Sequence, residues 1–181
     1  MATVVEYGPK KGKAGLPVNI IGDGFSVLTN VRVRFGSREV AAPLTVVKND
    51  QHVKAEVPSL PDGPVALVLV ADEIPDGLFV GGFTVGTVPE GTAVTDVYPD
   101  VLDPNLPTDV RIFGYGFRDV GAAGAVSVMF GSSTVQGTAV DSTLIVATAP
   151  PRPPRGTQCF NVTAIFVDGT QAVAAELTCY T

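Results

Sequence analysis

Apolar and polar residues alternate over short stretches along the whole chain. In the first half these stretches are residues 18–20 (Val-Asn-Ile) and 31–35 (Val-Arg-Val-Arg-Phe). In the second half they are residues 110–112 (Val-Arg-Ile) and 126–130 (Val-Ser-Val-Met-Phe). Alternation sends successive side chains to opposite faces, so each stretch predicts a half-buried β-strand. Residues 65–71 are apolar throughout and predict a buried strand, and no longer segment has helical periodicity.

The pattern occurs twice, with a period of about 92 residues. Gly-Asp-Gly-Phe at 22–25 recurs as Gly-Tyr-Gly-Phe at 114–117, and Phe-Gly at 35–36 recurs at 130–131. We expect the glycines to close a strand where φ is positive or another backbone segment approaches closely, with the following Phe folding back into the core. The residues of this structural repeat motif are Gly22, Gly24, Phe25, Phe35, Gly36, Gly114, Gly116, Phe117, Phe130 and Gly131.

Two copies of about 90 residues, each with short strands separated by turn residues, predict an all-β chain of two tandem Ig-like antiparallel β-sandwiches. We place the first domain at residues 1–86, a linker at 87–93 and the second domain at 94–181. Pro89 is expected to stiffen the linker. The composition, 45% hydrophobic and 17% charged, is that of a globular protein.

The order of the short motifs resembles the IPT/TIG type of Ig-like domain. The motifs of the first copy are Tyr7–Pro9, Gly22–Phe25, Val33–Gly36, Pro58, Gly63–Val70, Asp76-Gly77 and Phe83–Val85. Those of the second copy are Tyr98-Pro99, Gly114–Phe117, Val128–Gly131, Pro150, Gly156–Val167, Asp168-Gly169 and Leu177–Cys179. The resemblance covers nearly the whole chain and implies that Tyr7 and Tyr98 are equivalent. It implies a fold and no single role, because such domains serve receptors, transcription factors, polysaccharide-active enzymes, and bacterial and phage surface proteins.

Catalytic residues are missing from the sequence. His52 is the one histidine, and no Ser or Cys nucleophile has a base in its pattern. The acids are scattered over turns, so paired carboxylates for glycoside cleavage are not expected. We therefore predict a protein that is not an enzyme and needs no cofactor. Two clusters in loops are expected to be solvated surface groups, namely Asp100, Asp103 and Asp109, which match no calcium motif, and Lys10, Lys11 and Lys13.

Charge and hydropathy exclude several partners. The formal net charge is −6, which opposes binding to nucleic acid or to an anionic membrane surface. No apolar stretch reaches the roughly 20 residues that span a bilayer. The N-terminus has no charged segment followed by an apolar one, so we expect no Sec signal peptide. Small-molecule binding is not expected, and a sugar platform is disfavoured because the chain has no Trp and four Tyr.

Cys159 and Cys179 allow two interpretations. Pairing about a turn centred on Gly169 would place them opposite each other, close enough for a disulfide. The apolar pattern argues against this, because the core face of the last strand is expected to hold Val173, Ala175, Leu177 and Cys179, whereas Cys159 is expected to face outward. A bulge of one residue would reconcile the faces and separate the thiols. We favour free thiols.

Met129 and Phe113 replace Arg34 and Ile21 of the first copy, and Met129 is expected to point outward. We take both as candidate interface residues. The first functional hypothesis is a virion surface protein, such as a phage capsid decoration or tail-associated protein. It would be made in the host cytoplasm and would contact a capsid or other assembly protein. The alternative is a bacterial cell-surface adhesion or carbohydrate-binding module. A DNA-binding, Rel-like domain ranks last because of the acidic charge.

Overall fold

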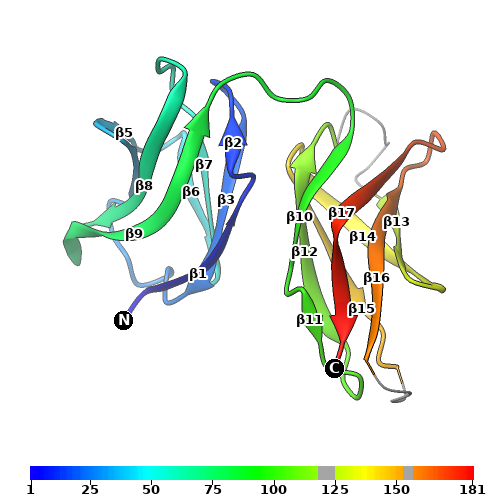
Figure 1. The fold of residues 1–181 in the computed structure, drawn as a ribbon. Coiled ribbons are helices and arrows are strands. Elements are labelled where there is room, and N and C mark those ends of the chain that lie inside the picture. The colour runs from blue at the N-terminus through cyan, green and yellow to red at the C-terminus, as the bar shows by residue number, and fades with distance from the viewer. Residues whose placement is uncertain (118–124, 153–156) are drawn as a thin grey trace. The chain divides into compact units, whose positions relative to one another are not determined.

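The computed structural model describes residues 1–117, 125–152 and 157–181, and in these residues it contains strands and no helix (Figure 1). The chain divides into two compact units, unit 1 (Met1–Val88) and unit 2 (Pro89–Thr181). The predicted all-β fold of Ig-like sandwiches is confirmed. The boundaries of two independently folding domains remain a prediction.

Unit 1 packs two sheets face to face. The first sheet has the order β1 (Thr3–Gly8), β3 (Pro17–Asp23), β7 (His52–Glu56) and β6 (Thr45–Asn49). The second has the order β2 (Lys11–Gly12), β9 (Ile74–Val85), β8 (Gly63–Ala71), β4 (Arg32–Phe35) and β5 (Arg38–Val40). Phe35 and Phe83 meet edge to face inside, with ring centroids 5.5 Å apart.

Unit 2 has the corresponding strands in one continuous hydrogen-bonded sheet. The order is β10 (Ala93–Tyr98), β12 (Thr108–Tyr115), β15 (Leu144–Ala149), β14 (Ser133–Asp141), β13 (Ala125–Phe130), β16 (Gln158–Ile165), β17 (Gln171–Tyr180) and β11 (Val101–Leu102). The long strand β14 joins the two layers, because it pairs with β13 at one end and with β15 at the other. The core between the layers includes Phe117 and Phe166, whose rings stack 6.0 Å apart.

The two copies differ where β14 of unit 2 is replaced by β5 and β6 of unit 1. Cross-strand pairing makes Val40 equivalent to Val135, and Thr45 equivalent to Gly137. In unit 1 the four residues 41–44 lie between Val40 and Thr45. In unit 2 only Gln136 lies between the equivalent positions. The additional residues include a proline, which cannot donate to a sheet hydrogen bond. The layers of unit 1 therefore separate along this edge.

Glycine is required at the positions of the repeat motif for two different structural reasons. A Cβ on Gly22 would lie 1.9 Å from the carbonyl oxygen of Thr3, and one on Gly114 would lie 2.0 Å from that of Ala93. Strand pairing at these positions therefore leaves no room for a side chain. Gly24 and Gly116 instead have positive φ, at 76° and 70°. The next residue of each copy, Phe25 and Phe117, is buried in the core.

The expected core face of the last strand is wrong. The residues of β17 that are buried are Ala172, Ala174, Thr178 and Tyr180, whereas Val173 and Leu177 are each 54% exposed. Two additional residues of β17 are accommodated in a bulge, because Thr163 pairs with Val173 but Asn161 pairs with Leu177. An offset of two residues keeps each side chain on its face.

The expectation of free thiols is also wrong, for the same reason. Cys159 pairs directly with Cys179 on the outer face, and their sulfur atoms form a disulfide with an S–S distance of 2.05 Å. The side-chain amide of Asn161 donates a hydrogen bond to the carbonyl of Ala174 across the bulge, at 2.8 Å. This bond stabilises the offset that brings the two cysteines together.

The expected equivalence of Tyr7 and Tyr98 is off by one residue. Tyr7 pairs with Ile20 in unit 1, and the residue that pairs with the equivalent Ile112 in unit 2 is Val97. Tyr98 instead pairs with Arg111. Tyr7 is buried and Tyr98 is half-buried, which agrees with their different positions on the strand.

Candidate functional site

A row of four side chains crosses the outer face of the five-stranded sheet of unit 1. Glu39 pairs with Arg34, Arg34 pairs with Val68, and Val68 pairs with Phe79. Directly paired residues of antiparallel strands share a face, and neighbouring strands lie about 4.8 Å apart. The backbones of Phe79 and Arg34, two strands apart, are therefore about 10 Å from each other along the row. Phe79 is 66% exposed, although it is a large apolar residue. We call these four residues the Phe79 row.

The corresponding row of unit 2 has no charge and no aromatic ring. Its members are, in the same order, Thr134, Met129, Thr163 and Val173. The same fold therefore forms without an arginine, a carboxylate or an exposed ring at these positions. Stability of the sheet does not account for the residues of the Phe79 row, which makes them candidates for binding.

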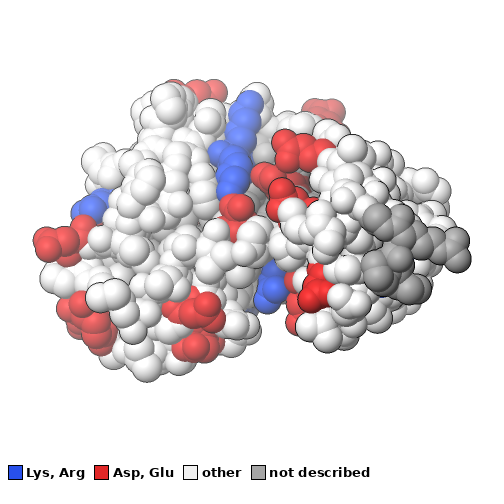
Figure 2. Space-filling view, turned by 60° about the horizontal axis from the view of Figure 1, so that its bottom comes forward, with Lys and Arg blue, Asp and Glu red and all other residues white. Residues whose placement is uncertain are grey.

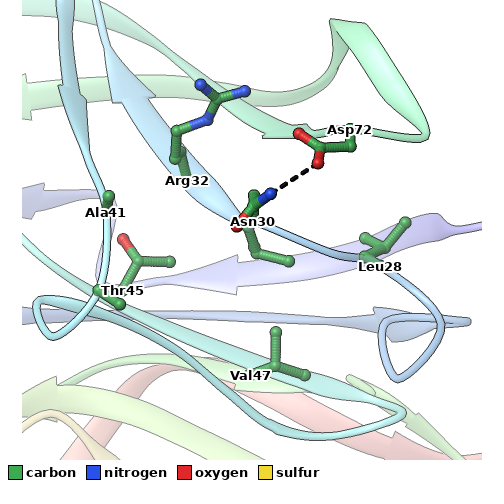
Figure 3. A pocket seen from close by; sticks show the side chains of 9 residues that line it. Leu28, Asn30, Arg32, Ala41, Thr45, Val47 and Asp72 are labelled. Carbon is green, nitrogen blue, oxygen red and sulfur yellow. Dashed lines mark hydrogen bonds between the residues drawn. The ribbon is translucent and has the colours of Figure 1, made fainter.

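A pocket of about 600 Å³ opens beside this row, at the edge where the layers of unit 1 separate (Figure 3). Arg32 and Asp72 lie on one side of it and Val47 on the other, with Asn30 between them in the view. The residues between β5 and β6 contribute Ala41 and Ala42. The pocket thus results from the extension of the chain that is specific to the first copy. The lining residues are Leu28, Asn30, Val31, Arg32, Ala41, Ala42, Thr45, Val47 and Asp72.

Arg32 connects the pocket to the Phe79 row. One of its terminal nitrogens lies 3.7 Å from a carboxylate oxygen of Glu39, and a terminal nitrogen of Arg34 lies 3.7 Å from the other oxygen. Both distances exceed those of ordinary hydrogen bonds. The Nε of Arg32 is buried and has no hydrogen-bond partner among the described residues. Two guanidinium groups therefore share one carboxylate, and their donors are poorly satisfied.

Two acidic residues accept hydrogen bonds from the loop that carries Asn30. Asp72 accepts a hydrogen bond of 2.6 Å from the side-chain amide of Asn30. Glu73 accepts one of 2.9 Å from the backbone N–H of Thr29 and one of 2.7 Å from its hydroxyl. These bonds, from the N–H first and then the hydroxyl, lower the pKa of Glu73. These bonds therefore hold the segment that carries Asn30 against the turn after β8.

The histidine and two of the aspartates considered in the sequence have local partners, and His52 and Asp109 lie in strands β7 and β12. His52 has a ring nitrogen 2.7 Å from the side-chain oxygen of the buried Asn19. Asp103 accepts a hydrogen bond from the N–H of Asn105, and Asp109 accepts one from the hydroxyl of Thr148. In the part of the chain that the structure describes, no group of three His, Cys, Asp or Glu residues could hold a metal ion.

Lys10 follows β1 and contacts two residues of that strand. Its ammonium group forms an ion pair with Glu6, donates to the carbonyl of Tyr7 and lies 3.6 Å from the centre of the Tyr7 ring. On the face shown in Figure 2, basic groups form a narrow stripe and small patches beside acidic groups, and no broad basic surface is in view. Across the described segments, we find no helix with the length and apolar character needed to cross a membrane.

The two candidate interface residues have different surroundings. Met129 is half-buried on the outer face of unit 2, as expected, in the row that ends at Val173. Phe113 is completely buried. The sequence indicated that Met129 replaces Arg34. It did not indicate which residues lie beside Arg34 on the sheet, because the other members of the row come from strands distant in the sequence. The signal for Phe79 was an aromatic residue after the Asp76-Gly77 turn, where the second copy has no ring.

An IPT/TIG domain model matches residues 2–85. Several solved structures also resemble the chain. SGBP-B of the Bacteroides ovatus mixed-linkage glucan utilization locus, in complex with a mixed-linkage heptasaccharide, is 17% identical with a TM-score of 0.39, over 95% of this chain and 43% of that one. The surface glycan-binding protein PbSGBP-B from Prevotella bryantii is 14% identical with a TM-score of 0.35, over 98% and 42%. This chain thus spans less than half the length of either protein.

The fibronectin(III)-like modules of Clostridium thermocellum CbhA are 14% identical to the chain, with a TM-score of 0.28. The match covers 99% of this chain and 92% of that one. The comparison with curated protein sequences found no match.

Proposed function

Since an IPT/TIG domain model matches residues 2–85, we propose that the protein is a non-catalytic module that binds a glycan through the outer face of unit 1. The observation that carries the proposal is the exposure of Phe79, at 66%, in a row with Arg34 and Glu39. An exposed aromatic ring can pack against the C–H bonds of a sugar ring. Guanidinium and carboxylate groups supply directed donors and acceptors for sugar hydroxyls.

The environment of the protein is proposed to be oxidising, as at a bacterial cell surface. The disulfide between Cys159 and Cys179 supports this, because such bonds persist outside the reducing cytosol. The two thiols are brought together by a bulge that the fold itself stabilises, so the bond is expected to form once the compartment permits it.

The test is binding to a panel of soluble polysaccharides, measured by affinity electrophoresis and by calorimetry. We expect Phe79→Ala to weaken binding at least tenfold, because the apolar platform is lost. The matched control is Val173→Ala, which truncates the equivalent position of unit 2 and should leave binding unchanged. If the panel shows no ligand, or if Phe79→Ala binds as well as the unaltered protein, the proposed function is wrong.

A second candidate function is a protein contact through the outer face of unit 2, as in a virion surface protein. The exposed apolar residues Val173 and Leu177, on the same face as Met129, favour it. The experiment is co-sedimentation with capsids or tails, comparing the unaltered protein with Met129→Lys. Equal co-sedimentation of the two proteins, or none of either, would exclude this face as the contact.

A further inference from the structure

Two guanidinium groups, one lining the pocket and one beside it in the Phe79 row, have donors that no described residue satisfies. Arg32 and Arg34 each approach Glu39 at 3.7 Å, and the described residues accept no hydrogen bond from either guanidinium. Their side chains are about one-third exposed, so solvent screens them only in part. This half-buried cluster carries one positive charge more than Glu39 can balance.

The charges of this cluster are specific to the first copy. Arg32 is equivalent to Ser127, Arg34 to Met129, and Glu39 to Thr134, as the strand pairing shows. Unit 2 therefore has uncharged residues at all three of these positions. Desolvating arginine side chains costs free energy that a fold recovers only through good partners. An external partner would explain why unit 1 retains them.

The chemistry of a guanidinium group selects the partner. Its planar N–H groups match the two oxygens of a carboxylate and can bind it with two parallel hydrogen bonds. Asp72 also lines the pocket and carries a negative charge, but its carboxylate accepts the amide of Asn30. An incoming carboxylate is therefore expected on the side of the pocket where Arg32 approaches Glu39, and not beside Asp72.

We propose that the pocket binds the carboxylate of a uronic acid residue, within a glycan whose neighbouring sugar packs on Phe79. This inference rests on the proposed function and names the class of its ligand. The backbones of Phe79 and Arg34 are about 10 Å apart along the row, and Arg32 lies two residues from Arg34 on the same strand, so one oligosaccharide can reach both the ring and Arg32. Arg32 would bind the carboxylate directly, and Arg34 would balance Glu39 once Arg32 is engaged.

The experiment compares acidic polysaccharides with their neutral counterparts. The probes are polygalacturonate, alginate and hyaluronate, each used also after chemical reduction of its carboxyl groups to primary alcohols. We expect at least one acidic polymer to bind at least tenfold more tightly than its reduced form, with an affinity that falls as salt is added. Equal affinity for the acidic and reduced forms would overturn the inference.

The variants separate this inference from the proposed function. Arg32→Gln should remove the preference for the acidic form and retain the affinity for the reduced form. Phe79→Ala should weaken both. Arg111→Gln removes the same charge from unit 2 and should change neither. If neutral glycans bind through Phe79 and Arg32→Gln has no effect, the uronate site is wrong and the glycan-binding function stands. If no glycan binds, both are wrong.

Discussion

The hydroxyl of Tyr7 in β1 donates a hydrogen bond of 2.5 Å to the carbonyl of Gly82 in β9, and so connects the two sheets of unit 1. The ring packs against the neighbouring Gly81, where a Cβ would lie 2.5 Å from it. The absence of a side chain at Gly81 therefore leaves space for this tyrosine. Because Tyr7 is buried, loss of its hydroxyl would leave the Gly82 carbonyl short of a partner.

We expect Tyr7→Phe to lower the free energy of unfolding of unit 1 by about 1 kcal/mol. Chemical denaturation of the whole chain measures the change. Tyr98→Phe is the control, because the Tyr98 hydroxyl has no hydrogen bond to a described residue, and it should have little effect. Equal stabilities of the Tyr7→Phe variant and the unaltered protein would show that the bond between the sheets contributes nothing.

Gly22→Ala is expected to destabilise unit 1 by about 3 kcal/mol, because the new methyl group would meet the Thr3 carbonyl and force β1 away from β3. Thermal unfolding measures the effect. Gly82→Ala is the control, since a Cβ there has no atom within 4 Å. A loss of the same size in both variants would point to the general cost of replacing glycine and not to the close approach.

Removal of the disulfide should destabilise unit 2. Cys159 and Cys179 are separated by 20 positions, and closing a loop of that length in the unfolded chain corresponds to about 3 kcal/mol. The double variant Cys159→Ser, Cys179→Ser should unfold at lower denaturant than the oxidised protein. The unfolding midpoint of the double variant should equal that of the unaltered protein whose disulfide has been reduced. If reduction does not change the unfolding midpoint, the disulfide does not stabilise the fold.

The Thr29 contact with Glu73 should depend on pH. The pKa of Glu73 is held below its ordinary value of 4.5, so the stabilisation is complete above pH 4.5 and is lost as the pH falls through the lower value of the folded state. We expect the amide signal of Thr29 in NMR spectra to shift in that acidic range.

Glu73→Gln is the control for this titration, because a neutral amide cannot gain a proton there. The Thr29 signal of the variant should stay constant over the same range. A titration that persists in the variant would contradict the role of Glu73.

Local sequence patterns were sufficient to predict the architecture. The alternation along 31–35 and 126–130 corresponds to β4 and β13, with Val33 and Val128 inside. Such patterns work because the side-chain direction of a strand depends only on the parity of the position. They fail where a bulge, stabilised by a residue of another strand, changes the register of a strand, as in β17. There the bulge depends on a hydrogen bond from Asn161, 13 positions away from Ala174.

The candidate site could not be predicted in the same way. The Phe79 row joins four strands, and its existence depends on the register between them, which no single segment encodes. The pocket depends on the additional residues between Val40 and Thr45, whose sequence shows a loop but not which edge it opens. The comparison of the two copies provided two useful signals, the change from Arg34 to Met129 and the aromatic Phe79 after a turn where the second copy has no ring.

The bulge between β16 and β17 also restricts how this hairpin can diverge among descendants of the same gene. Loss of one residue between Val173 and Leu177 would turn Tyr180 toward solvent and Cys179 toward the core, whereas loss of two would preserve both. Insertions and deletions in this segment should therefore be retained only when they add or remove two residues together. Homologous chains that have lost the pair should lack the amide at the position of Asn161, since it would have no bulge to span.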